Sequence, residues 1–138
     1  MEKNPKAEIE LTSASYNQLK QELLKEAPAI ARPFITRILN IIKSIQPNDA
    51  ITYILNNTSL KEIINNSIDL RMSLAFARGI IKSNPSIKKA LSNILTSPVV
   101  KLILKFENPE LYNAIEITPN GDRWLSHIIS DLREILKV

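Results

Sequence analysis

Cysteine is absent from the 138 residues of this chain, and glycine occurs only at Gly79 and Gly121. Without cysteine the chain can form neither disulfides nor thiolate metal sites. Two isolated glycines cannot build a P-loop or a dinucleotide-binding loop, because both loops need several glycines in one short stretch. The sequence therefore excludes the two commonest glycine-rich nucleotide sites.

Histidine is equally scarce, since His127 is the single one. A histidine-based metal site or a Ser–His–Asp triad would have to depend on this residue. Its spacing from Asp131 and Glu134 places it on the polar side of the last predicted helix, where an exposed imidazole with acidic neighbours is expected. No apolar pocket is indicated around these carboxylates that would suit acid–base catalysis. We therefore expect a protein that is not an enzyme and that uses no cofactor or metal.

Long apolar runs are also missing. No stretch approaches the roughly 18 residues needed to cross a bilayer, and the chain begins with the polar MEKNPKAEIEL rather than with a secretory signal. These features predict a cytoplasmic protein without membrane contact. The length and the 44% share of hydrophobic residues suffice for one domain with its own core, which we place at residues 1–138 with a loose segment at 1–11.

Proline pairs divide the chain into helices. Five of them precede segments with apolar residues at helical spacing: Gln46-Pro47, Asn84-Pro85, Ser97-Pro98, Asn108-Pro109 and Thr118-Pro119. Proline suits the first helical position, and Asn, Ser or Thr before it can accept hydrogen bonds from the free amides of the first turn. After Gln46, Asn48 is the expected cap, and Ser59 with Glu62 forms a capping-box pattern.

The expected fold is all-α: a compact bundle of about seven to nine helices joined by tight turns. The predicted helices cover about 13–27, 33–45, 49–55, 60–66, 68–82, 85–95, 99–106, 109–115 and 119–137. Segment 99–106, VVKLILKF, would also suit a strand because of its β-branched residues, with AEIEL at 7–11 as the one weak partner. We predict a helix there.

Segment 99–106 is apolar on several sides of either a helix or a strand. A small bundle has difficulty hiding so much apolar surface, and Val99–Phe106 is therefore a candidate surface for self-association or for a protein partner. The alternative is that this helix is central and simply buried.

Acidic residues are missing between Asp69 and Glu107. Seven basic residues lie in the same span: Arg71, Arg78, Lys82, Lys88, Lys89, Lys101 and Lys105. In a chain with a net charge of +4, this concentration indicates a polyanionic partner. These seven residues are the predicted nucleic-acid contacts.

The stretch LRMSLAFARGIIK, residues 70–82, carries three of these cations. On a helical wheel its apolar residues cover most of the circumference, which predicts a helix at the centre of the bundle: Leu70, Met72, Leu74, Phe76, Ala77, Ile80 and Ile81. Arg71, Arg78 and Lys82 share the remaining strip. Cations spaced in this way release counterions when they meet phosphates, which gives salt-dependent and mostly sequence-independent binding to DNA or RNA.

A plainer interpretation of the same strip is a solvated edge that raises solubility or pairs with acids of the first helix, such as Glu22 and Glu26. Aromatic residues are seven in number and fall mostly on core faces, so base stacking is not expected.

Residues 74–82, LAFARGIIK, resemble the Leu-Ala-aromatic-Ala stretch with a following base in some small helical subunits of CRISPR effector complexes. The resemblance covers this stretch alone. It implies a basic surface that holds a guide or target strand and a protein that packs against neighbouring subunits.

Two hypotheses follow. The first is a non-enzymatic helical module that contacts nucleic-acid phosphates, as a subunit of a larger nucleoprotein complex. The alternative is a protein–protein adaptor or a homo-oligomeric structural subunit with no nucleic-acid role.

Overall fold

A computed structural model of the chain describes residues 14, 16–18, 20–21, 25, 29 and 31–138. Every regular element among them is helical, which confirms the predicted all-α bundle. The helices are α2 (Ala31–Ser44), α3 (Pro47–Leu55), α4 (Leu60–Asn65), α5 (Ile68–Ser83), α6 (Pro85–Ile94), α7 (Ser97–Glu107), α8 (Pro109–Ile117) and α9 (Gly121–Leu136). The predictions for segment 1–11 and for part of helix 13–27 lie outside the described residues.

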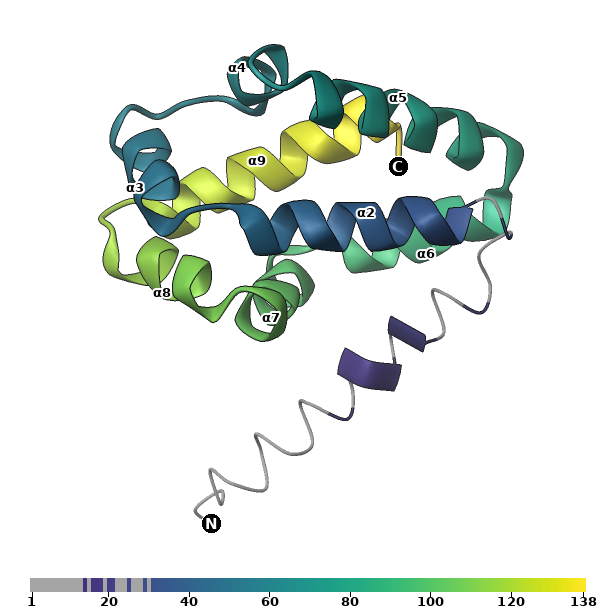
Figure 1. Ribbon diagram of the computed structural model, residues 1–138, viewed down its shortest axis with the longest axis horizontal. Coiled ribbons are helices and arrows are strands. Elements are labelled where there is room, and N and C mark those ends of the chain that lie inside the picture. Colours follow the sequence, from purple (N-terminus) through teal and green to yellow (C-terminus); the bar gives the residue numbers. More distant parts are fainter. Residues whose placement is uncertain (1–13, 15, 19, 22–24, 26–28, 30) are drawn as a thin grey trace.

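The helices pack around α9, which runs through the bundle (Figure 1). Helix α5 lies beside α9, and α2 lies below both in this view, in front of α6, and contacts α5 and α7. Helices α3, α7 and α8 gather at one end, around the start of α9, while the C-terminal end of α5 meets α6 at the other. This places the beginning and the end of α9 in two different environments.

Three helices, α4, α5 and α8, begin with a side-chain cap from the residue before the first turn. Ser59 and Glu62 form the expected capping box of α4, and Ser67 accepts a hydrogen bond of 3.2 Å from the Leu70 amide at the start of α5. Asn108 caps α8 by accepting 3.1 Å from the amide of Leu111. Side-chain capping of this kind satisfies amides that have no partner inside the helix.

Three predicted caps are wrong. Ser97 is the first residue of α7 and not the residue before it. Asn84 precedes α6 as predicted, but its side chain makes no capping hydrogen bond there. Helix α3 begins at Pro47, so Asn48 lies inside it; the ring of proline already has the helical backbone angle and needs no hydrogen bond to its nitrogen. Thr118 ends α8 instead of starting α9, because its hydroxyl donates to the Ala114 carbonyl at 2.6 Å. Asn120, in the left-handed region at φ 67°, then turns the chain into α9.

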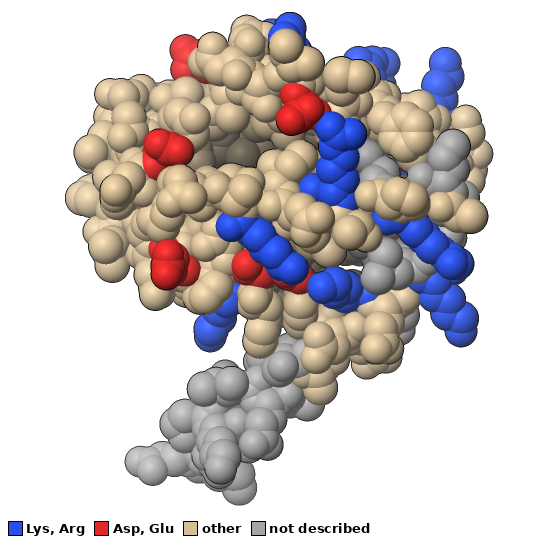
Figure 2. All heavy atoms as spheres, viewed as in Figure 1, with Lys and Arg blue, Asp and Glu red and all other residues tan. Residues whose placement is uncertain are grey.

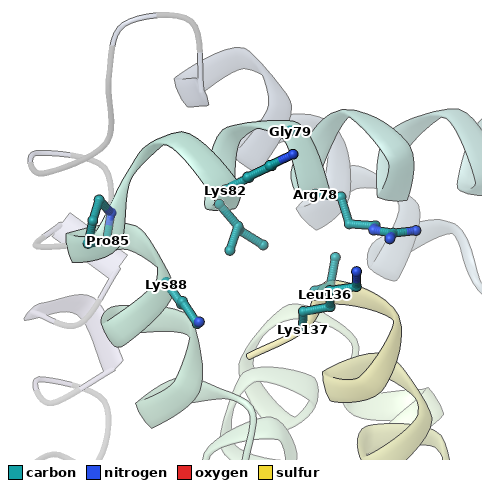
Figure 3. Close-up of a pocket in the computed structure, with 8 residues that line it drawn as sticks. Arg78, Gly79, Lys82, Pro85, Lys88, Leu136 and Lys137 are labelled. Carbon is teal, nitrogen blue, oxygen red and sulfur yellow. The ribbon is translucent and has the colours of Figure 1, made fainter.

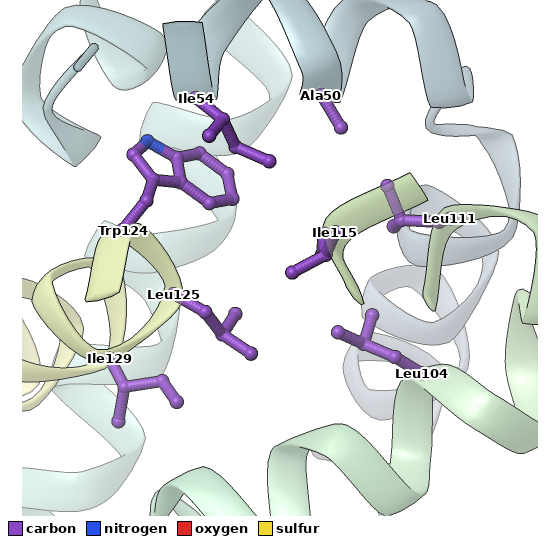
Figure 4. Close-up of a cluster of buried hydrophobic side chains, with 8 residues drawn as sticks. All are labelled: Ala50, Ile54, Leu104, Leu111, Ile115, Trp124, Leu125 and Ile129. Carbon is purple, nitrogen blue, oxygen red and sulfur yellow. The ribbon is translucent and has the colours of Figure 1, made fainter. Parts of the chain in front are cut away.

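Apolar side chains form two buried clusters. The first core joins α3, α7, α8 and α9 (Figure 4) and contains Ala50, Ile54, Leu104, Leu111, Ile115, Trp124, Leu125 and Ile129. The second core joins α5, α6 and the end of α9 and contains Leu74, Ala77, Ile81, Ile87 and Leu136. The stripe Leu74, Ala77 and Ile81 of α5 therefore faces inward, as the wheel predicts.

The prediction that α5 is central is wrong. Among its large apolar residues Ile68 is 66% exposed, Met72 62% and Phe76 43%. One side of α5 packs on α6 and α9, and these side chains lie round the other side. Segment 99–106 is helical, as predicted, and its apolar residues are buried or half-buried within α7.

Candidate nucleic-acid interface

The end of α5, the start of α6 and the end of α9 surround a hollow of about 510 Å³ (Figure 3). Four of the residues that line it are cationic: Arg78, Lys82, Lys88 and Lys137. In Figure 3, Arg78 and Lys137 lie on one side of the hollow, Lys88 lies across from them, and Lys82 projects from α5. Cations from three helices thus gather at one place.

Local structure explains this convergence. Pro85 forces a new helix to begin directly after Asn84, so Lys82 in the last turn of α5 and Lys88 in the first turns of α6 lie on either side of a tight turn. Leu136 anchors the end of α9 in the second core. Its neighbour Lys137, at φ 58°, ends the helix in the left-handed conformation and lines the hollow.

The hollow is strongly positive. None of the described residues that line it is acidic, and within the described part of the chain Arg78, Lys82, Lys88 and Lys137 form no ion pair. The sequence places Glu134 three residues before Lys137 on α9, and it too is outside the lining. Four like charges near one recess repel one another, and an anion bound there would relieve that repulsion.

Figure 2 shows how charge is distributed over one face of the molecule. Red acidic side chains lie over the left and centre of this view, whereas the right-hand end shows blue basic side chains. That end is where α5 meets α6 in Figure 1. On this face, the end of the molecule that carries the second core thus shows basic side chains and no acidic ones.

Three of the seven predicted contacts come together in the hollow: Arg78, Lys82 and Lys88. Arg71 and Lys89 are exposed on the same two helices but outside the lining. Arg71 lies seven residues before Arg78, which places it on the same side of α5 about two turns away. These two residues can extend the basic surface beyond the hollow.

The other two predicted contacts lie on α7, away from the hollow. Lys105 is exposed there. Lys101 is engaged by acids, with its Nζ 2.6 Å from Asp122 Oδ1 and 3.7 Å from Glu116 Oε1. The hydrogen bond that Lys101 donates to Asp122, together with the charges of both carboxylates, raises the pKa of Lys101. Because the charge of Lys101 is already compensated by two carboxylates, we exclude this residue from the candidate interface.

Lys137 is the residue that sequence reasoning missed. It lies more than thirty residues beyond the acid-free span, next to the acidic residues of α9. The apolar periodicity of the last helix could have placed Leu136 in a core, but nothing in the sequence pairs that core with α5. Arg133, by contrast, has a structural role: it donates to the carbonyls of Ser92 and Leu95 at the end of α6.

A second ionic cluster surrounds the Glu107 carboxylate at the end of α7. Lys20 lies 3.0 Å and Lys43 3.4 Å from its oxygens, and the Tyr16 hydroxyl donates to Oε1. Burial alone would raise the pKa of Glu107, but the hydrogen bonds from Tyr16 and Lys20 and the neighbouring charges outweigh it and lower the pKa. Burial and the contact with Glu107 raise the pKa of Tyr16. This cluster holds the described part of the first helix against α7.

The remaining predicted features fit a structural role. His127 is exposed on α9, as expected. Glu22 and Glu26, the acids proposed as partners of the α5 cations, lie outside the described residues. Among the residues that the structure does describe, no group of three or more His, Asp and Glu side chains could hold a metal ion. The same residues include no helix long and apolar enough to span a membrane.

No family model matches the chain, and no curated protein or solved structure is similar to it. The resemblance of residues 74–82 to small CRISPR subunits therefore stays a prediction. Any functional conclusion has to come from the geometry of the hollow and its surroundings.

Proposed function

We propose that this protein is a non-enzymatic helical module that binds nucleic acid through its phosphates, as a subunit of a larger nucleoprotein complex. The binding surface is the hollow lined by Arg78, Lys82, Lys88 and Lys137, with Arg71 and Lys89 on its flanks. One observation carries the proposal: the consecutive helices α5 and α6 and the distant end of α9 bring together four cations without ion pairs, among the described residues, at one recess with no acidic lining.

The electrostatics favour phosphate contacts over base reading. Lysine and arginine that neutralise phosphates release condensed counterions, and this gives affinity that falls steeply with salt. No aromatic residue lines the hollow, so a stacking platform of the kind seen in single-strand binding proteins is missing from the described site. Binding should therefore depend on salt much more than on sequence.

A titration at several salt concentrations against single- and double-stranded DNA and RNA tests the proposal. The variant Arg78→Gln/Lys82→Gln removes two cations of the hollow, and Lys61→Gln/Arg123→Gln removes one lysine and one arginine that are exposed elsewhere. The first variant should weaken binding and lower the salt slope by about 0.9 per lost contact on duplex DNA, or about 0.7 on single strands. The control variant has the same formal net charge and should retain the wild-type slope.

Two results would contradict this function. One is absence of binding to all four nucleic acids at low salt. The other is an equal loss of affinity in both variants, because that would trace the binding to net charge and not to the hollow. Circular dichroism of each variant establishes that its fold is intact.

A protein partner is a second candidate function, and the exposed side of α5 favours it over the α7 segment. The apolar residues of Val99–Phe106 are buried or half-buried, whereas Ile68 and Met72 lie exposed one turn apart on α5. Adjacent apolar side chains with that exposure are typical of interaction surfaces. Sedimentation over a range of concentrations tests self-association: Ile68→Gln/Met72→Gln should abolish it, and a wild type that stays monomeric would exclude it.

A further inference from the structure

The lining of the hollow is not only basic. Its four uncharged lining residues are Gly79, Ile81, Pro85 and Leu136, and two of them, Ile81 and Leu136, belong to the second core. The wall of the hollow is thus largely apolar and partly buried, with cations around it (Figure 3). An internal phosphodiester has a sugar on both sides and needs an open channel, whereas the end of a strand can enter a recess from one side.

The charges match a chain end better than they match a chain interior. An internal phosphate carries one negative charge, and its neighbours follow at fixed spacing. A phosphomonoester carries about −1.5 to −2 at pH 7 and presents three strong acceptor oxygens. Four cations from three helices around one recess provide donors for such a group from several directions.

The size of the hollow agrees with this interpretation. A volume of about 510 Å³ lies within the range of roughly 300–1,000 Å³ that is usual for small-ligand sites. It exceeds what one phosphate group would fill, and the apolar wall leaves room for the attached sugar and base. We propose that the hollow holds the terminal phosphate of a nucleic-acid strand, with the last nucleotide against Ile81 and Pro85. This inference rests on the proposed function, because it specifies which part of the nucleic acid enters the site.

Four single-stranded oligonucleotides of one sequence, prepared as DNA and as RNA, test the inference with the full chain. Three of them have the same length and carry hydroxyl ends, a 5′-phosphate or a 3′-phosphate. The fourth carries hydroxyl ends and is one nucleotide longer. The longer strand adds one internal phosphate and so controls for added charge. Each competes with a labelled strand, and one of the two phosphorylated strands should bind about tenfold more tightly than the longer strand, as expected for added charge-assisted hydrogen bonds. Which phosphate gives the gain distinguishes a 5′ from a 3′ end.

A matched pair of variants locates the effect. Lys88→Gln/Lys137→Asn removes two cations of the hollow that the earlier variant leaves in place, and asparagine suits the left-handed backbone at position 137. This variant should bind every strand more weakly, because it lacks two cations of the binding surface, and it should also lose the preference for a terminal phosphate. Lys61→Gln/Arg123→Gln should keep both the affinity and the preference. Circular dichroism again controls for folding.

The outcomes separate the two proposals. Equal affinity for phosphorylated strands and for the longer strand would overturn the inference and leave the proposed function standing. A preference that survives Lys88→Gln/Lys137→Asn would place the terminal phosphate elsewhere and overturn the assignment to the hollow. Absence of binding to every strand would overturn the proposed function and, with it, the inference.

Discussion

The two ends of the bundle are built differently. At the first-core end, buried polar groups are tied by hydrogen bonds: Asn108 Nδ2 donates at 3.0 Å to the carbonyls of both Ile42 and Ile45, and Trp124 Nε1 donates at 2.8 Å to the carbonyl of Thr58. In the α5 part of the second-core end, Ser73 Oγ is buried and, among the described residues, has no hydrogen-bond partner. The same end carries the unpaired cations of the hollow.

The comparison separates stability from binding. Fully satisfied polar networks rigidify a core and specify one packing, whereas unpaired like charges repel one another and do not stabilise the fold. The first core thus anchors the start of α9 and holds α2, α3, α7 and α8 together. The second core supports a charged surface that is available for a ligand.

The largest effect is expected for Gly121→Ala, at the buried start of α9 beside the first core. An added Cβ would lie 1.9 Å from the carbonyl oxygen of Ile115, and that atom belongs to the backbone of α8. Helices α8 and α9 would have to separate, which should lower the free energy of unfolding by about 3 kcal/mol or more. Chemical denaturation measures the loss. An unchanged midpoint would show that the two helices approach less closely than described here.

Asn108→Ala comes next. The substitution removes the donors to Ile42 and Ile45 and the acceptor that caps α8, and it leaves the buried amide of Leu111 without its side-chain partner. We expect a loss of about 2–4 kcal/mol in the free energy of unfolding. Asn108→Asp keeps the oxygen that caps α8 and lacks the two donors. The difference in stability between Asn108→Asp and Asn108→Ala therefore separates the contribution of the cap from that of the donors. If the aspartate variant equals wild type, the bonds to α2 contribute nothing.

Acid should weaken the first-core end through Glu107. Its pKa is lowered in the folded protein, so its contribution to stability is present above its unfolded pKa of about 4.5 and is lost as the pH falls through the lower folded pKa. Thermal unfolding of wild type at pH 7, 5, 4 and 3 should therefore decline at the acid end. Glu107→Gln should start from a lower midpoint at pH 7 and decline less; parallel curves for both proteins would contradict the role of this carboxylate.

The smallest effect, and the opposite sign, is expected for Gly79→Ala in α5. No atom lies within 4 Å of an added Cβ, and alanine is a better helix former than glycine. The free energy of unfolding should rise by about 0.5–1 kcal/mol. The same exchange at the two glycines would thus destabilise one end and stabilise the other. A loss at position 79 would show that the outer side of α5 is more tightly packed than its exposure indicates.

Local patterns predicted most of the fold. Proline pairs and helical spacing located α3 to α9 to within a few residues, because capping and apolar periodicity act within one or two turns. Thr118 shows a limit of predicting helix boundaries from local patterns. The sequence before Pro119 suits the start of one helix and the end of another equally well. Ile68 and Met72 show another limit, because a helical wheel identifies apolar residues and cannot tell which of them the fold will bury.

The candidate site was less predictable. Lys82 and Lys101 look alike in the sequence, and only the fold brings Asp122 and Glu116 to Lys101 while leaving Lys82 in a hollow without acids. Pairing between residues of different helices depends on tertiary packing, which the local pattern of one sequence does not encode. For the same reason Lys137 could not be joined to the cations of α5.

Trp124 is the single tryptophan of the chain and lies buried in the first core, with its indole nitrogen bonded to Thr58. Its fluorescence is therefore an intrinsic reporter of the end of the bundle that lacks the hollow. A ligand that occupies the opposite end should leave this emission nearly unchanged, while unfolding should shift it to longer wavelength. Occupancy and conformational integrity can thus be followed separately in one unlabelled sample.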